Sequence, residues 1–155
     1  MLKGKNAIIT GSNRGIGKAI VEAYAKNGAN IWACARKENP DFEREMKELS
    51  EKYHVWIKPI YFEMSDEEQI KGGVKRILAE KQNIDILVNN AGITRDGLLM
   101  KMAEEDFDAV IDTNLKGTFH CIRAVSRQML RQRSGRIINL SSVSGVLGNA
   151  GQANY

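Results

Sequence analysis

The chain has 155 residues, of which 43% are hydrophobic and 27% charged, and this balance excludes a disordered segment while allowing one domain with a buried core. The formal net charge of +4 suits an anionic ligand, but basic and acidic residues are interspersed, so we expect no nucleic-acid partner. No run of about 18 apolar residues occurs, so we expect no membrane-spanning helix.

The two cysteines, Cys34 and Cys121, lie far apart and lack the spacing of a metal or redox motif. We expect both to be buried thiols in a reducing compartment, and we expect no metal site. Lys3 and Lys5 precede only a short apolar run, so no signal peptide is expected. Together these features predict a cytoplasmic protein.

Strand and helix signals alternate from the N-terminus, which is typical of a parallel sheet with crossover helices. Short apolar segments predict strands over residues 6–10, 31–35 and 55–62. Apolar residues at helical spacing predict one helix over 16–27, ended by Asn27-Gly28, and a charged amphipathic helix over 41–53.

Pro59 lies inside the third expected strand. Proline is tolerated on an edge strand, and in a doubly wound sheet of order 3-2-1-4-5 the third strand is an edge. Pro59 therefore favours this topology.

The second half of the chain continues the alternation. Ser65, followed by Glu68, predicts a capping box at the start of the next helix. The remaining expected elements are a helix over 65–81, an apolar central strand over 84–88, a long helix over 104–131 and a strand over 136–140. The predicted fold class is α/β, a doubly wound Rossmann-type parallel sheet of order 3-2-1-4-5.

A glycine-rich turn joins the first strand to the first helix. Its glycines allow positive φ and let the backbone approach a pyrophosphate at the helix N-terminus. The spacing is G-x-x-x-G-x-G, whereas G-x-G-x-x-G is the commoner fingerprint. Placed between a strand and an amphipathic helix, the turn favours dinucleotide binding over a plain turn. The residues expected to bind the cofactor here are Gly11, Ser12, Asn13, Arg14, Gly15, Ile16 and Gly17.

The end of the second strand indicates which dinucleotide is bound. An NAD enzyme usually has an acidic residue here for the ribose hydroxyls, whereas this chain has Ala35 followed by Arg36. An arginine without that carboxylate suits a 2′-phosphate, and Arg14 in the glycine turn could reach the same phosphate. We therefore expect NADP, bound as NADPH, with two ordinary solvated arginines as the alternative.

Four further pieces together resemble the short-chain dehydrogenase/reductase family, and the resemblance spans the whole chain. Asn89-Asn90-Ala91-Gly92 closes the fourth strand as that family's strand-end motif does. Asn114 falls in the long helix where the family has a catalytic asparagine. Ser142 follows the fifth strand, and Tyr155, thirteen residues later, matches the catalytic tyrosine. The resemblance implies cofactor contacts from Asn90, Ala91 and Gly92 and catalytic roles for Asn114, Ser142 and Tyr155.

The family mechanism assigns a task to each of these side chains. It implies that hydride passes from the nicotinamide to a carbonyl carbon while Tyr155 donates a proton to the oxygen and Ser142 stabilises the developing alkoxide. Asn114 would hold a water that feeds protons to the site, although a polar residue that kinks the helix is the simpler alternative. Ser141 could substitute for Ser142, and only the count to Tyr155 selects between them.

Two departures from the family pattern affect these expectations. Glu63-Met64 stand where the family often has an aspartate and a small aliphatic residue near the adenine, so we expect a cofactor contact that is longer or absent. The family's tyrosine is followed four residues later by a lysine, and its sheet continues. We therefore expect residues 1–155 to form a single NADP-binding domain that is truncated on its C-terminal side.

The stretch that includes Leu98-Leu99-Met100 and the stretch over 148–155 are similar to bacterial β-ketoacyl-acyl carrier protein reductases, and acetoacetyl-CoA reductases share much of both. The resemblance implies NADPH-dependent reduction of a 3-oxoacyl thioester on acyl carrier protein in fatty acid synthesis, by a tetramer built partly on the long helix. The alternatives are an acetoacetyl-CoA reductase, another short-chain alcohol, steroid or sugar dehydrogenase, and a non-catalytic nucleotide-binding fragment.

A basic cluster lies between the long helix and the fifth strand. It could dock an acidic acyl carrier protein by electrostatic steering, or it could be an ordinary solvated face. Its members are Arg127, Arg131, Arg133 and Arg136.

Overall fold

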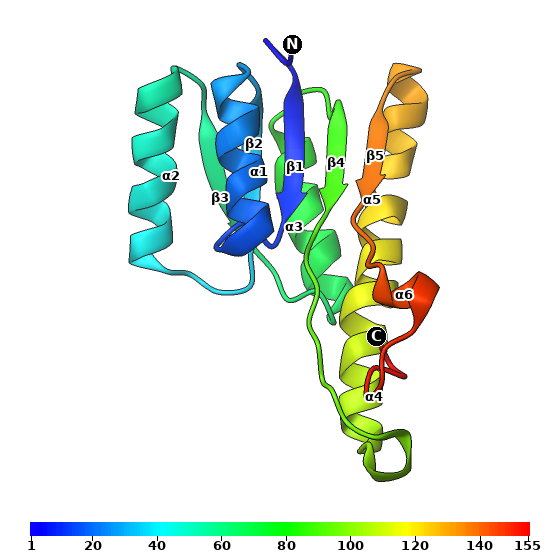
Figure 1. The fold of residues 1–155 in the computed structure, drawn as a ribbon. Coiled ribbons are helices and arrows are strands. Elements are labelled where there is room, and N and C mark those ends of the chain that lie inside the picture. Colours follow the sequence, from blue (N-terminus) through cyan, green and yellow to red (C-terminus); the bar gives the residue numbers. More distant parts are fainter.

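Five parallel strands form one sheet in the computed structural model, which describes residues 1–155 (Figure 1). The strand order is β3-β2-β1-β4-β5, which confirms the predicted topology and places the Pro59 strand at an edge. The strands are β1 (Asn6–Thr10), β2 (Asn30–Ala35), β3 (Ile57–Tyr61), β4 (Ile86–Asn89) and β5 (Arg136–Asn139).

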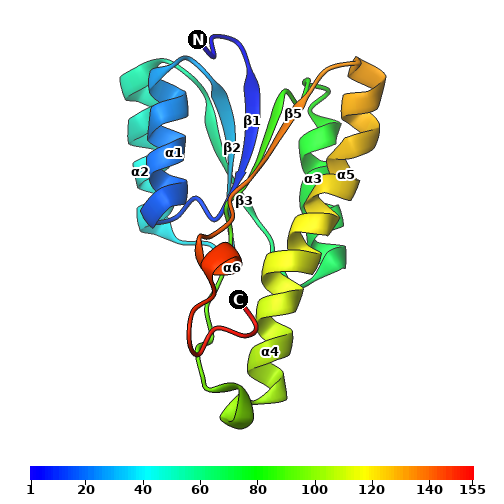
Figure 2. The ribbon, with the colours of Figure 1, turned by 45° about the vertical axis from the view of Figure 1, so that its right-hand side comes forward.

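Helices cover both faces of the sheet, as Figure 2 shows: α1 (Gly15–Lys26) and α2 (Pro40–Tyr53) lie on one face, and α3 (Glu67–Ala79) and α5 (Gly117–Gln132) lie on the other. The remaining helical segments are the 3₁₀ turn η1 (Leu99–Lys101), α4 (Glu104–Val110), the π-helical turn η2 (Ile111–Lys116) and α6 (Ser144–Leu147). None of these helices combines the length and the apolar character that a bilayer crossing requires.

Two hydrophobic cores result from the alternation of side chains along the central strands. Ala7 and Ile9 of β1 point into the core under α1 and α2, which also contains Phe42. Ile8 points to the opposite face and packs in the core under α3 and α5 with Trp32 of β2. Because both faces are covered, the central strands are apolar between their end residues, as the sequence predicts.

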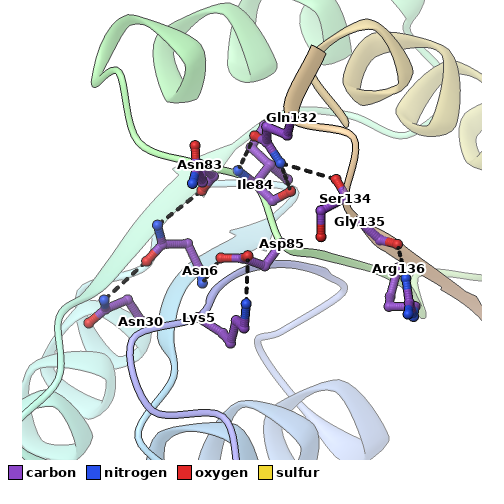
Figure 3. A network of polar contacts seen from close by, with 10 residues as sticks. All are labelled: Lys5, Asn6, Asn30, Asn83, Ile84, Asp85, Gln132, Ser134, Gly135 and Arg136. Carbon is purple, nitrogen blue, oxygen red and sulfur yellow. Dashed lines mark hydrogen bonds and ion pairs between the residues drawn. The ribbon is translucent and has the colours of Figure 1, made fainter. Parts of the chain in front are cut away.

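A network of polar contacts joins the segments at the amino ends of the strands (Figure 3). The Asp85 carboxylate accepts a hydrogen bond from the Asn6 backbone N–H at 2.9 Å and pairs with Lys5 at 3.2 Å. The Gln132 amide, at the end of α5, accepts from the Ile84 N–H and donates to the Ile84 carbonyl, each at 2.9 Å. These bonds fix the end of α5 to the start of β4, far from the strand ends where the glycine turn lies.

The capping box predicted at Ser65 is wrong. The N-cap of α3 is Asp66, whose Oδ1 accepts hydrogen bonds from the backbone N–H groups of Glu68 (3.0 Å) and Gln69 (3.1 Å). Hydrogen bonds from the Gln69 backbone and side chain, and to a smaller extent the bond from Glu68, lower the pKa of the Asp66 carboxyl. Ser and Asp are both good N-cap residues, so two adjacent ones leave the helix start uncertain by one residue.

The helix predicted over 104–131 is interrupted by the π-helical turn η2. Within this turn, the Asn114 side chain bonds to the backbone of Ile93, in the connection that follows β4. Gly117 follows the turn, and a Cβ there would lie only 2.5 Å from the Met64 carbonyl oxygen. Such π-helical turns are frequent at functional sites.

Cys34 and Cys121 are both buried, as predicted. Burial raises the pKa of the Cys121 thiol to about 12, and burial, with a smaller contribution from Cys121, raises the pKa of Cys34 well above its ordinary value. Both thiols therefore keep their protons over a pH range in which an unfolded chain would lose them.

We expect the stability of the fold to decrease as the pH rises above about 9, where free thiols ionise. The folded state then binds more protons than the unfolded state, so the free energy of unfolding falls by at most about 1.4 kcal/mol per pH unit for each thiol. Urea unfolding between about pH 8 and pH 11 measures this slope. The Cys121→Ala variant should show a shallower slope, and an unchanged slope would contradict the assignment.

Candidate active site

A cleft of about 920 Å³ lies at the carboxyl ends of the strands. Residues at or just after the ends of β1, β2, β3 and β4 line it, including Thr10, Ala35, Phe62 and Asn90. In an open parallel sheet, this is where the chain connections from neighbouring strands turn to opposite faces and leave a crevice. The cleft therefore occupies the usual ligand position of a doubly wound fold.

The glycine turn forms one wall of this cleft, and its backbone allows no side chain at two positions. A Cβ on Gly17 would lie 2.0 Å from the Gly11 carbonyl oxygen, so the start of α1 packs directly against the end of β1. Gly11 has a φ of +68°, and a Cβ there would lie 2.9 Å from the Ala91 Cα. Glycine is required at both positions because neighbouring backbone packs too closely to leave room for a Cβ.

The Thr10 side chain ties the end of β1 to the residues after β4. Its hydroxyl accepts hydrogen bonds from the backbone N–H groups of Asn90 and Ala91, each at 3.0 Å, and donates to the Val88 carbonyl at 3.4 Å. The Asn90 amide donates in turn to the carbonyls of Thr10 (3.0 Å) and Gly11 (3.2 Å). These bonds set the floor of the cleft between β1 and β4.

The N-terminus of α1 lies in the cleft without any side chain to cap it. Its N-cap residue, Arg14, makes no side-chain capping bond, and the first turn contains no acidic residue. Uncapped N–H groups and the positive end of the helix dipole together attract an anion. Gly15, Ile16 and Gly17 of this turn line the cleft, so the terminus is available to a phosphate group.

Two arginines stand at the same end of the cleft. Arg14 and Arg36 both line it and are exposed. The Arg36 Nε lies 3.8 Å from Glu63 Oε2, and the Arg36 side chain remains 67% exposed. This contact is too long and too solvated to hold the guanidinium in place, so Arg36 stays free to bind an anion.

Nearly all of the residues predicted to bind a cofactor line this one cleft; only Ser12 does not. Ser12 is buried, and its hydroxyl donates to the Ile9 carbonyl at 2.7 Å, so it supports the turn from beneath. The predicted residues in the cleft wall are Gly11, Asn13, Arg14, Gly15, Ile16, Gly17, Arg36, Glu63, Met64, Asn90, Ala91 and Gly92.

Sequence reasoning missed several lining residues. They lie near strand ends, in the connections after β3 and β4, or on the helix α4 and the turn η2, so only the fold brings them together. The missed residues are Thr10, Cys34, Ala35, Phe62, Ser65, Ile93, Arg95, Glu105, Asp108, Ala109, Asp112 and Thr113.

Asn114 lies behind the cleft wall and holds the connection that follows β4. Its Oδ1 accepts from the Ile93 N–H and its Nδ2 donates to the Ile93 carbonyl, each at 2.9 Å. A Cβ on Gly92 would lie 3.3 Å from the same Oδ1. The amide is thus locked against the strand-end motif.

Ser142 and Tyr155 both belong to the segment that runs from the end of β5 past α6 to the side of α4 (Figure 2). The Ser142 hydroxyl accepts a hydrogen bond from the Ser144 N–H at 3.2 Å, at the start of α6. Tyr155 is 42% exposed, and its backbone N–H donates to the Gln152 carbonyl at 3.1 Å. The two hydroxyl groups share no hydrogen bond in this structure.

The fold and the glycine turn are those of a dinucleotide-binding α/β protein, and comparison with known families supports this class. The family model for short chain dehydrogenases matches residues 5–155, and the chain belongs to this family.

Individual relatives show a more specific sequence similarity within this family. The chain is 47% identical to a 3-oxoacyl-[acyl-carrier-protein] reductase of Staphylococcus aureus (strain N315), over 97% of the chain and 61% of the relative. It is 46% identical to the enzyme of that name from Thermotoga maritima, over 99% and 62%. It is 43% identical to the one from Salmonella typhimurium, over 99% and 61%. The chain thus spans about three fifths of the length of these relatives.

We expect Gly17→Ala to weaken both the fold and dinucleotide binding, because the new methyl group would collide with the Gly11 carbonyl oxygen. Overpacking of this kind costs about 1–3 kcal/mol of folding free energy. Denaturant unfolding and NADPH fluorescence titration measure the two effects. Gly72→Ala is the matched control: Gly72 is an exposed helical residue with open space around its Cβ, and its substitution should stabilise the protein by up to about 1 kcal/mol.

Proposed function

We propose that the protein is an NADPH-dependent reductase that converts a 3-oxoacyl thioester, carried on acyl carrier protein, into the 3-hydroxyacyl thioester. The observation that carries this proposal is the 43–47% identity to reductases of that name over nearly the whole chain. A cleft at the carboxyl ends of the strands, built from the predicted glycine turn, supports it.

The residues of the cleft fit a pyridine dinucleotide. The uncapped N-terminus of α1 suits the pyrophosphate, and the close packing at Gly11 and Gly17 holds this terminus at the end of β1. Arg14 and Arg36 suit a 2′-phosphate, which supports NADP over NAD. We infer that residues 1–155 act as one cofactor-binding unit. NADPH, when bound, supplies the hydride.

In the proposed reaction, Tyr155 donates its phenolic proton to the carbonyl oxygen of the substrate. Ser142 donates a hydrogen bond to the same oxygen and stabilises the charge that develops on it. Asn114 has one more amide N–H than its bond to Ile93 uses, and this group can hold a water that returns protons to the site.

We infer that the protein works as a homotetramer in the cytoplasm, with the long helix at a subunit contact. The helix that runs through α4, η2 and α5 exposes the large apolar side chains of Phe107, Leu115 and Phe119. Exposed apolar groups of this size on one element are typical of a contact surface.

The basic cluster is less suited to docking the carrier protein. Arg136 is the first residue of β5 and pairs with Ile86, the first residue of β4, so it lies at the amino ends of the strands (Figure 3). The cleft lies at the opposite ends. This position favours the alternative that Arg127, Arg131, Arg133 and Arg136 form an ordinary solvated face.

The proposed function predicts NADPH oxidation in the presence of acetoacetyl-CoA or a 3-oxoacyl thioester on acyl carrier protein. The product of the complete gene is assayed at 340 nm. Tyr155→Phe should lower kcat by about 10²-fold or more, the usual contribution of a proton donor, and should leave NADPH binding unchanged. Turnover of a steroid or sugar with none of a 3-oxoacyl thioester would refute the substrate assignment.

The cofactor assignment predicts that Arg36→Ala weakens NADPH binding by about 10-fold, the loss of one charge-assisted hydrogen bond, and leaves NADH binding nearly unchanged. Dissociation constants from fluorescence titration of both cofactors measure the difference. Arg44→Ala is the matched control, because Arg44 is an exposed arginine that pairs with Asp41 on the outer surface of α2. Equal losses for NADPH and NADH would argue against a 2′-phosphate site.

A further inference from the structure

The connection after β4 receives hydrogen bonds from two distant parts of the chain. We name residues 93–97 the anchor segment. On one side, the Asn114 amide of η2 holds Ile93 by two bonds of 2.9 Å. On the other side, the stretch that ends in Tyr155 is bonded to Arg95, Asp96 and Gly97. The anchor segment therefore joins the proposed catalytic asparagine to the stretch that carries the proposed proton donor.

Asn154 makes the most buried of these bonds. Its Nδ2 donates to the Arg95 carbonyl at 2.8 Å and to the Asp106 carbonyl, in the first turn of α4, at 3.2 Å. Asn154 is 5% exposed and is the one buried residue between 130 and 155. One side chain thus fixes the stretch before Tyr155 to both the anchor segment and α4.

The other bonds to the anchor segment hold the stretch less firmly. Gln152 Nε2 donates to the Asp96 carboxylate at 3.2 Å, but this bond lies at an exposed position. The Gly97 N–H donates to the Gly151 carbonyl at 2.8 Å, a backbone bond that tolerates most side chains. Tyr155 itself is 42% exposed, so its ring is only partly packed against the chain.

We propose that Asn154 is a positioning residue for the proton donor: it sets the place of Tyr155 by anchoring the adjoining backbone to Arg95 and Asp106. This inference rests on the proposed function. Proton and hydride transfer require reacting atoms within a few tenths of an ångström of the productive geometry, and a displacement of about 1 Å can reduce the rate about 100-fold.

The test replaces Asn154 in the product of the complete gene. Asn154→Asp keeps the shape of the side chain but turns its donor into an acceptor that repels both carbonyls, and it should lower kcat about 100-fold. Asn154→Ser keeps one uncharged donor and should recover part of the activity. Asn83→Asp is the matched control, since Asn83 is an exposed asparagine at the amino ends of the strands whose side chain makes no hydrogen bond, and it should change kcat less than about 2-fold.

Three further measurements distinguish positioning from a loss of folded protein. In Asn154→Asp, the dissociation constant and stoichiometry of NADPH should equal those of the parent protein, because the glycine turn is untouched. The KM of the thioester should change little. The primary isotope effect with NADPH deuterated at the transferred position should rise, because the chemical step becomes slower. A smaller active fraction would lower kcat without raising this isotope effect.

The inference is overturned if Asn154→Asp retains kcat within about 2-fold of the parent, or if its kcat falls only in proportion to the NADPH sites with an unchanged isotope effect. Should Asn154→Asp fail to fold, the same readouts on Asn154→Ser decide the question. If the parent protein reduces no 3-oxoacyl thioester, the proposed function itself fails. Activity in the parent with no effect of Asn154 overturns this inference alone.

Discussion

The site depends on the direct contact between the backbone of the glycine turn and the ends of β1 and β4. Gly17 packs against the Gly11 carbonyl with no room for a side chain, and the Thr10 hydroxyl holds Asn90 and Ala91 at the other side. These contacts bring the N-terminus of α1 and the strand-end motif together at the carboxyl ends of the strands. A larger residue at Gly11 or Gly17 would separate them, and the cleft would lose its floor.

The start of α1 differs from the starts of α2 and α3, which also follow strands. Side chains cap the helices α2 and α3: Asn39 and Asp66 each accept two backbone N–H bonds. Both helices also carry acidic residues in the first turn, whereas α1 has neither a side-chain cap nor an acid. Because only uncapped N–H groups can bind an external anion, the start of α1 in the cleft is open to one.

Sequence patterns predicted what local rules determine and missed what the tertiary structure determines. Local propensity and topology predict the alternation of strands and helices, the edge position of Pro59 and the glycine turn. The sequence carries no signal that the Ser12 hydroxyl is buried and donates to the Ile9 carbonyl. At Asn114 the sequence offered a kinked helix only as an alternative, and it gave no signal for the bond to Ile93, 21 residues earlier in the chain.

The polar groups of the molecule divide between the two ends of the sheet. At the amino ends, Asp85 binds the Asn6 N–H, the Asn6 side chain binds the Asn83 carbonyl, and Gln132 binds the Ile84 backbone, so these side chains serve the fold (Figure 3). At the carboxyl ends, Thr10 binds the residues after β4 and Asn114 binds Ile93, beside the cleft. A side chain that holds distant backbone sets geometry over long sequence separations. In the proposed mechanism, the position of Tyr155 depends on the connection after β4, part of which also lines the cleft.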